Sequence, residues 1–209
     1  MKVSFAILTH NEHDYIEKLI QWLLKYKQPQ DEIVVVDDYS EGVTQAVLEE
    51  HAIEGNIHLF FNSLNNDFAK QKNFLIQQCT GDWIFNIDAD EIPHYILLRD
   101  FRKILEVNPD VEAYRISRVN VVKGMTDSDA MRWRWTINEH GWINWPDYQL
   151  RLFKNDYPRI KWVSPVHETL IGFKAMSHLP SKEEYSFLHE KTIERQTLQN
   201  EFYQRIQLQ

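Results

Sequence analysis

The chain has 209 residues, 43% of them hydrophobic and 26% charged, an ordinary balance for one folded domain with a sizeable core. Its net charge of -8 gives no general attraction for nucleic acid, so we predict no nucleic-acid partner. One cysteine excludes an internal disulfide, and no apolar run approaches the roughly 18 residues of a membrane span. We therefore expect no transmembrane segment and a cytoplasmic location.

Strands and helices alternate through the first half of the chain. Short apolar runs predict strands at residues 3–8, 32–36, 57–61 and 83–87. Helical spacing of apolar side chains predicts helices at residues 14–26, 44–50 and 68–78. This alternation is typical of crossover units, so we predict an α/β fold with a mostly parallel central sheet flanked by helices.

Polar residues follow three of these predicted strands. They are Thr9, His10 and Asn11, then Asp37 and Asp38, and finally Asp88 and Asp90. The carboxyl ends of parallel strands share one edge of a sheet, and ligands bind there. We therefore expect these side chains to converge on one ligand-binding rim.

Asp88 and Asp90 form a D-x-D sequence directly after the fourth predicted strand. Neighbouring carboxylates repel each other and take up protons unless a cation offsets their charge. Mg²⁺ and Mn²⁺ prefer oxygen ligands and commonly bridge carboxylates to phosphates. The alternative, which the spacing alone would favour, is that the aspartates form a turn and cap a following helix. Acids at several strand ends on one rim favour the metal site.

The second half of the chain has a different character. We predict a helix at residues 96–107, an exposed strand at 113–122, a tryptophan-rich stretch and a polar helix at 193–209. Trp142 and Trp145 offer flat faces for a sugar ring, whereas Trp83 and Trp162 are expected in the core. We predict a single domain over residues 1–209, with a nucleotide-binding half (1–92) and an acceptor-binding half (93–209).

Five motifs stand in order along the chain: ILTHNE, VVVDDYS, FAKQKNFLIQQCTGDWIFNIDADE, HGWINWPDYQLRLF and PVHETL. The set resembles family 2 glycosyltransferases of the GT-A (Rossmann-like) fold, especially the small lipopolysaccharide-core and capsule-type enzymes. The resemblance covers residues 3–170. It implies inverting transfer of a sugar from a nucleotide sugar, usually a UDP-sugar, to a glycan acceptor. It also implies Mn²⁺ or Mg²⁺ at the D-x-D sequence.

The resemblance implies roles for residues near the first two strands. Thr9, His10 and Glu12 would contact the nucleotide, and Asp38 would accept a hydrogen bond from the uracil ring. Asp37 beside it is expected to be structural. Tyr39 stands where the family often has glycine, so this turn is expected to differ.

The resemblance also assigns the donor's phosphates. Lys72 and Asn73 occupy a position that is commonly arginine-asparagine, so Lys72 would pair with the diphosphate. The alternative for Lys72 is a solvated helix face. Asp88 and Ala89 would lie near the ribose or the metal, and Asp90 would ligate the metal directly.

The second half would supply the base that deprotonates the acceptor hydroxyl. Asp147, in WPDYQLRLF, is our first candidate, and Glu168, in PVHETL, is its rival. Burial beside tryptophan would raise the pKa of such a carboxyl group, whereas Arg151 would lower it. His167 is the candidate metal ligand, with His189 as the alternative.

The sequence thus predicts a metal-dependent glycosyltransferase. A catalytically silent nucleotide-sugar or glycan-binding module on the same scaffold is the alternative, and the candidate bases favour the enzyme. A nucleotidyltransferase would need a glycine-rich phosphate loop near the first strand. None of the 6 glycines lies there.

Overall fold

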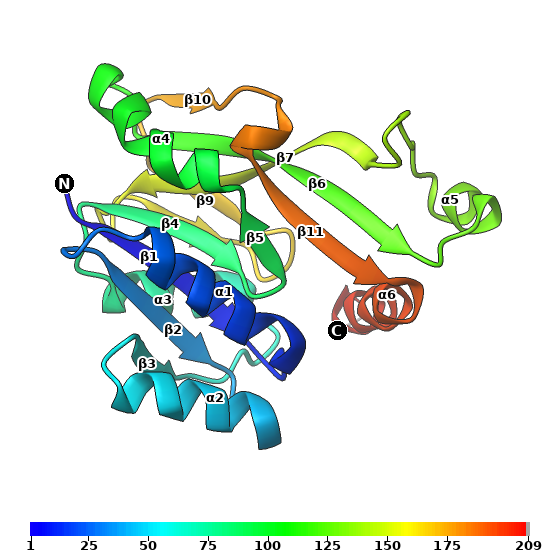
Figure 1. Ribbon diagram of the computed structural model, residues 1–209, viewed down its shortest axis with the longest axis horizontal. Helices are drawn as coiled ribbons and strands as arrows, with labels where there is room; N and C mark the ends of the chain where they lie inside the picture. Colours follow the sequence, from blue (N-terminus) through cyan, green and yellow to red (C-terminus); the bar gives the residue numbers. More distant parts are fainter. Residues whose placement is uncertain (208–209) are drawn as a thin grey trace.

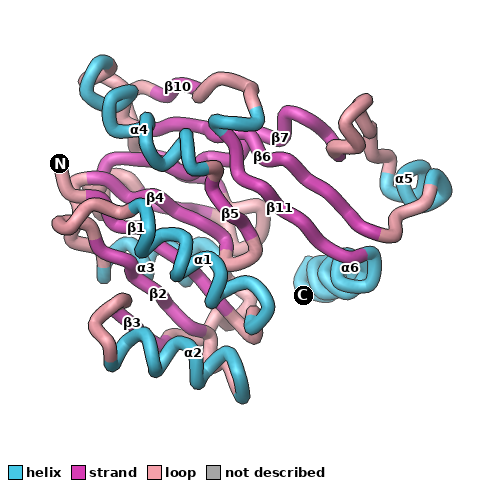
Figure 2. Tube along the Cα trace, in the orientation of Figure 1, coloured by secondary structure: helices cyan, strands magenta, loops and turns pink. Residues whose placement is uncertain are grey.

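The computed structural model describes residues 1–207 and has one large mixed sheet with helices on both faces (Figure 1). The strand order is β3-β2-β1-β4-β7-β6-β11-β5, with β10 beside β6. A separate pair, β8 and β9, completes the strands of the described residues. Strands from both halves of the chain thus share one sheet, as the tube in Figure 2 shows.

The first half forms the parallel part of the sheet. Its strands are β1 (Val3–Thr9), β2 (Glu32–Asp37), β3 (His58–Phe61) and β4 (Trp83–Asp88), and β1 lies between β2 and β4. Its helices are α1 (His13–Tyr26), α2 (Gly42–Ile53) and α3 (Phe68–Gln78). All predicted elements of this half are confirmed, although α2 is longer than expected at both ends.

The second half adds antiparallel and parallel pairings to the same sheet. In chain order its elements are β5 (Glu91–Pro93), α4 (Tyr95–Val107), β6 (Ala113–Lys123), α5 (Asp127–Trp133), β7 (Ile143–Lys154), β8 (Lys161–Val163), β9 (Thr169–Ile171), β10 (Met176–His178), the short 3-10 helix Glu183–Tyr185, β11 (Ser186–Thr192) and α6 (Ile193–Gln207). The predicted C-terminal helix is confirmed as α6. Residues 208–209 of that prediction lie outside the described residues.

Side chains of alternate strand residues build two cores, one on each face of the sheet. Phe5 and Phe85 face α1 and α4 in the larger core. Ala6 and Ile84, the next residues on these strands, pack against α3 and the β8-β9 pair in the other core. Trp83 and Trp162 are buried, one in each core, as predicted.

One expectation about local structure is wrong, and one alternative that the sequence left open is confirmed only in part. The strand predicted at 113–122 is not exposed, because β6 pairs with β7, β10 and β11 and most of its first residues are buried. The acids at 88 and 90 form a turn, but they do not cap the next helix. β5 intervenes, and His94 caps α4 by accepting a hydrogen bond from the backbone N–H of Ile96 at 3.2 Å.

A buried carboxylate joins β1 and β2 at the amino ends of the strands. Glu32 accepts hydrogen bonds from Lys2 Nζ at 2.7 Å, Ser4 Oγ at 2.5 Å and the backbone N–H of Thr80 at 2.6 Å. Burial alone would raise the pKa of Glu32, but these donors outweigh it and lower the pKa to about 2. Glu32 therefore stabilises the fold in its ionised form.

We predict that Glu32→Gln destabilises the protein at neutral pH and flattens the acid dependence of its stability. Because the pKa is lowered on folding, this stabilisation is present above the ordinary value of 4.5 and is lost as the pH falls toward 2. Urea unfolding should show a loss of about 1–3 kcal/mol at pH 7 that shrinks as the pH falls. Exposed Glu49→Gln is the control. An equal loss at pH 7 and pH 3 would contradict this account.

Candidate functional site

The predicted rim is formed by the carboxyl ends of β1, β2 and β4. The strands are in register there, with Leu8 between Val36 and Asp88, and Thr9 beside Asp37. Asp37 is buried and accepts hydrogen bonds from the backbone N–H and the hydroxyl of Ser40, at 2.7 and 2.5 Å. Its role is structural, as expected.

Asp38 and His10 lie on the more open part of this rim. Asp38 is half-buried, and its Oδ1 accepts a hydrogen bond from the backbone N–H of Leu64 at 3.1 Å. His10 is exposed, and its Nδ1 lies 2.7 Å from the carbonyl oxygen of Asp38. Thr9 is buried, and its hydroxyl has no hydrogen-bond partner among the described residues.

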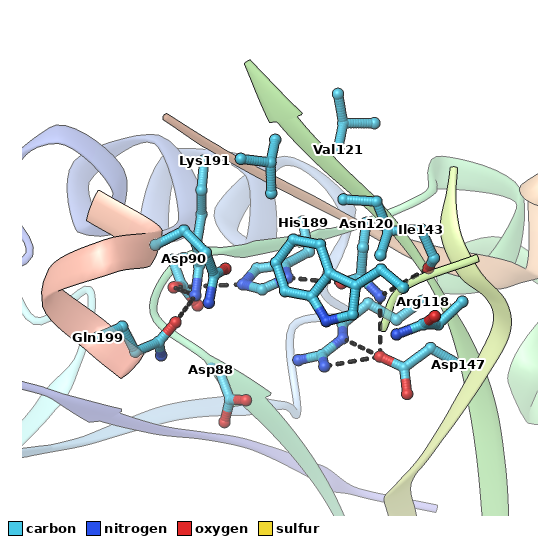
Figure 3. A pocket seen from close by; sticks show the side chains of 14 residues that line it. Asp88, Asp90, Arg118, Asn120, Val121, Ile143, Asp147, His189, Lys191 and Gln199 are labelled. Carbon is cyan, nitrogen blue, oxygen red and sulfur yellow. Dashed lines mark hydrogen bonds and ion pairs between the residues drawn. The ribbon is translucent and has the colours of Figure 1, made fainter. Parts of the chain in front are cut away.

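A cavity of about 350 Å³ lies beyond the end of β4 (Figure 3). Residues from β4, β6, β7, β11 and α6 contribute its charged and polar lining, which includes Asp88, Asp90, Arg118, Asn120, Asp147, His189 and Lys191. The size is at the lower end of the range for small-molecule sites. Two chains of ion pairs surround this cavity.

The first chain of ion pairs links Asp88 to Asp147. Arg151 donates to Asp88 Oδ1 at 3.0 Å and to Glu91 Oε1 at 2.6 Å. Arg118 donates to the same Glu91 oxygen at 3.1 Å and to Asp147 Oδ2 at 2.7 Å. Burial would raise the pKa of Asp88, but the positive charge of Arg151 outweighs it and holds the pKa well below its usual value.

The second chain links Glu12, Arg195, Asp90 and Lys191. Lys191 Nζ lies 3.1 Å from Asp90 Oδ2, and Arg195 Nη2 lies 3.5 Å from the same oxygen. Arg195 also contacts Glu12, at the start of α1. The chain therefore joins β11 and α6, at the end of the sequence, to the start of α1 and the D-x-D turn.

His189 and Asn120 bridge the two chains, because the parallel register of β6 and β11 places them side by side. Asn120 Nδ2 donates to Asp147 Oδ2 at 2.9 Å, so its Oδ1 faces the other way, 2.7 Å from His189 Nδ1 (Figure 3). A carboxylate only accepts hydrogen bonds, so this pairing makes Nδ1 of His189 a hydrogen-bond donor to Asn120. His189 Nε2 then faces Asp90 Oδ2 at 3.4 Å.

The protonation state of His189 determines whether Nε2 donates a hydrogen bond or presents a lone pair. Burial lowers the pKa of His189, although Asp90 acts in the opposite direction. Without a proton on Nε2, the ring presents a lone pair to a carboxylate oxygen. A bound cation would complete such an arrangement, and the hydrogen bond at Nδ1 would orient the ring for it.

Only one of the two candidate bases lies in this cavity. Asp147 lies in the cavity with Asp88 and Asp90. Its Oδ1 accepts from Gln149 at 2.8 Å, and its Oδ2 accepts from Arg118 and Asn120. Burial would raise the pKa of Asp147, but these partners, Arg118 above all, lower it. Arg118, rather than the Arg151 that we expected, acts directly on Asp147.

Glu168 lies in a second cavity of about 270 Å³ and forms an ion pair with Lys72. The ammonium of Lys72 also lies 4.4 Å from the ring centroid of Trp162, and Lys72 is buried rather than on a solvated helix face. Asn73 exchanges hydrogen bonds of 2.8 and 2.9 Å with the backbone of Trp162, which ties α3 to β8. The structure thus assigns Asn73 a packing role.

Two candidates from the sequence remain, Ala89 in the D-x-D turn and His167 away from it. Ala89 is buried between the two aspartates. His167 is exposed, has a positive φ of 55° and lines neither of the two cavities among the described residues. The sequence interpretation missed Arg118, Asn120, Lys191 and Arg195. The signal for the three strand residues was polar residues two apart on one strand face, as in Arg118-x-Asn120 and His189-x-Lys191, whereas Arg195 lies in helix α6 and gave no such signal.

The site has one unbalanced negative charge. Five carboxylates and four cationic side chains make up the two chains, namely Glu12, Asp88, Asp90, Glu91 and Asp147 against Arg118, Arg151, Lys191 and Arg195. Within residues 1–201, no three of the histidine, cysteine and acidic side chains already lie together as a metal site. Asp88 instead faces Arg151, and Asp90 faces Lys191 and Arg195.

Comparison with known proteins gives matches in sequence and in fold. A family model described as "Glycosyl transferase family 2" matches residues 4–165. The lipopolysaccharide core biosynthesis glycosyltransferase LpsC of Rhizobium meliloti (strain 1021) is 30% identical over 118 residues, which cover 56% of this chain and 42% of LpsC. The putative teichuronic acid biosynthesis glycosyltransferase TuaG of Bacillus subtilis (strain 168) is 28% identical over 90 residues, 43% of this chain and 36% of TuaG.

Among solved structures, residues 1–349 of TarS from S. aureus superpose with a TM-score of 0.60 at 17% identity. This likeness covers 91% of the present chain and 60% of that one. The chain thus spans about two-fifths of the length of the curated relatives that it matches. In the described part of the chain, no helix has both the length and the apolar character needed to cross a membrane.

Proposed function

This chain belongs to glycosyl transferase family 2 and has the GT-A fold, and from that premise we propose that it transfers a sugar from a nucleotide sugar to a glycan acceptor with the help of a divalent cation. The observation that carries the proposal is the cavity beyond β4. It collects the D-x-D acids, His189 and Asp147 at the carboxyl edge of a parallel sheet. Ligands of α/β sheets bind at this edge.

The residues of the cavity fit a divalent cation. Asp88 and Asp90 supply the oxygen ligands that Mg²⁺ and Mn²⁺ prefer, and His189 presents Nε2 beside Asp90. When bound, the cation would neutralise charge on the leaving diphosphate. We assign the nitrogen ligand to His189 rather than His167, because His189 lies in the cavity and Asn120 orients its ring.

We propose that the nucleotide lies along the rim formed by β1 and β2. TarS was crystallised with UDP-GlcNAc, and the present chain shares its fold, which supports a UDP-sugar as donor. Asp38 and His10 are the exposed or half-buried polar groups at this rim, and Asp38 would accept from the base. Thr9 and Glu12 lie at the same edge, with Glu12 held by Arg195.

We propose that the acceptor approaches from the second half of the chain. β6 and β7 extend from the sheet as an arm that carries α5 at its tip (Figure 1). Trp135 lines the cavity from this arm, and Trp142 packs edge-on against Trp145 with ring centroids 4.8 Å apart. These half-buried rings offer faces for sugar stacking.

Asp147 remains our candidate base because it shares the cavity with the D-x-D acids, whereas Glu168 is engaged by Lys72 elsewhere. The lowered pKa of Asp147 keeps it ionised at neutral pH and therefore able to accept a proton. Its contacts with Arg118 and Asn120 fix its orientation. Attack from the side opposite the leaving group would invert the sugar's configuration.

The proposal predicts metal-dependent release of a nucleoside diphosphate. A panel of UDP-, GDP- and TDP-sugars should show turnover with one donor class in Mn²⁺ or Mg²⁺, and chelator should abolish it. Asp90→Asn should lose this activity and still unfold cooperatively, at a lower melting temperature because buried Lys191 loses its counter-charge, whereas exposed Asp110→Asn should retain full activity. Full activity in excess chelator would reject the metal. Donor binding without turnover would favour a silent binding module.

The assignment of the base makes a separate prediction. Asp147→Asn should bind the donor and metal normally but transfer about 10²- to 10⁴-fold more slowly, the usual loss for a general base. Single-turnover kinetics with the active donor measures this. Glu168→Gln is the matched comparison, because it removes the other acid from its ion pair. The reverse pattern would make Glu168 the base, and normal rates in both variants would exclude either acid.

A further inference from the structure

One carboxylate oxygen of Asp90 contacts three nitrogen-bearing side chains. Lys191 Nζ, His189 Nε2 and Arg195 Nη2 lie 3.1, 3.4 and 3.5 Å from Asp90 Oδ2. The side chain of Lys191 is only 3% exposed, and within residues 1–201 Asp90 is its sole ion-pair partner. Lys191 also donates a hydrogen bond to Gln199 of α6 (Figure 3).

These three contacts cannot all persist once a divalent cation binds the carboxylate of Asp90. A buried ammonium group needs a counter-charge, and losing that charge is costly. Lys191 and Arg195 would then face a metal ion of the same sign across the cavity. Glu12 could still hold Arg195, and its charge also acts on Lys191 from a longer distance, but within residues 1–201 no second carboxylate forms an ion pair with Lys191.

We propose that Lys191 and Arg195 bind the diphosphate of the donor, and that Asp90 is the counter-ion that holds both cations in place until the donor arrives. The inference rests on the proposed function, because it needs a donor diphosphate in this cavity. In this proposal Lys191 and Arg195 take the phosphate-binding role that the sequence suggested for Lys72. Lys72 is instead paired with Glu168 and stacked on Trp162 in the other cavity.

The charge of the site supports this exchange. The two ion-pair chains carry one net negative charge, so a diphosphate alone would be repelled. A divalent cation reverses the sign and leaves Lys191 and Arg195 without their shared carboxylate. The diphosphate can then accept charge-assisted hydrogen bonds from both Lys191 and Arg195. Metal and diphosphate should therefore strengthen each other's binding, and the coupling must be reciprocal.

The inference predicts opposite changes for two ligands in one variant. Lys191→Met keeps an apolar stem in the buried position but removes the cation that competes for Asp90. Calorimetry with MnCl₂ alone should show binding about 3- to 10-fold tighter than wild type. Titration of UDP and GDP in saturating Mn²⁺ should show binding about 10- to 100-fold weaker, the cost of a lost charged hydrogen bond.

Two further variants keep this test decisive. Arg195→Gln alters a partly exposed residue and should show the same opposite changes if Lys191→Met fails to fold. Lys123→Met, on the neighbouring strand, removes an exposed lysine paired with Glu190 and should match wild type for both ligands. Unchanged nucleotide affinity in the Lys191 and Arg195 variants, or a parallel loss of Mn²⁺ and nucleotide binding, would overturn the inference. A wild type that binds neither nucleotide would overturn the proposed function itself.

Discussion

The carboxylate of Asp90 is the contact on which the charged site depends. It lies in the turn after β4, where it meets His189, Lys191 and Arg195 from the last strand and helix. Carboxylates packed this closely would take up protons without nearby positive charge. Contacts with His189 first and Lys191 second lower the pKa of Asp90 well below its usual value, despite the opposing effect of burial. The acids therefore stay ionised and remain available to a metal ion.

The sheet explains how residues far apart in sequence reach this point. β4 ends at Asp88 beside the end of β1, and the parallel pairing of β6 with β11 sets Asn120 next to His189. Residues two apart on a strand share a face, so Lys191 follows His189 into the cavity. The antiparallel pairing of β6 and β7 adds Asp147 opposite Arg118. Backbone register thus sets the order of the charges before any ligand binds.

The sequence could predict the parallel half of the fold because its apolar runs and helical spacings are local signals. The D-x-D turn and the rim formed by β1, β2 and β4 were predictable for the same reason. The partners of those acids were not. Arg118 and Asn120 lie in a stretch whose alternation looks like an exposed strand, yet β6 is interior because three strands pair with it. The roles of Lys191 and Arg195 depend on ion pairs with residues about a hundred or more positions away in the chain. The periodicity of the sequence gives no information about such distant pairs.

The most direct test of this account is the position of the metal ion when the donor nucleotide is present. Anomalous diffraction from crystals grown with MnCl₂ and UDP would locate Mn²⁺ without assumptions about its ligands. The account predicts a peak among Asp88, Asp90 and His189, with Lys191 and Arg195 turned from Asp90 to the diphosphate. A manganese peak beside His167 and Glu168 would contradict it. UDP bound in the cavity with the contacts of Asp90 unchanged would contradict it equally.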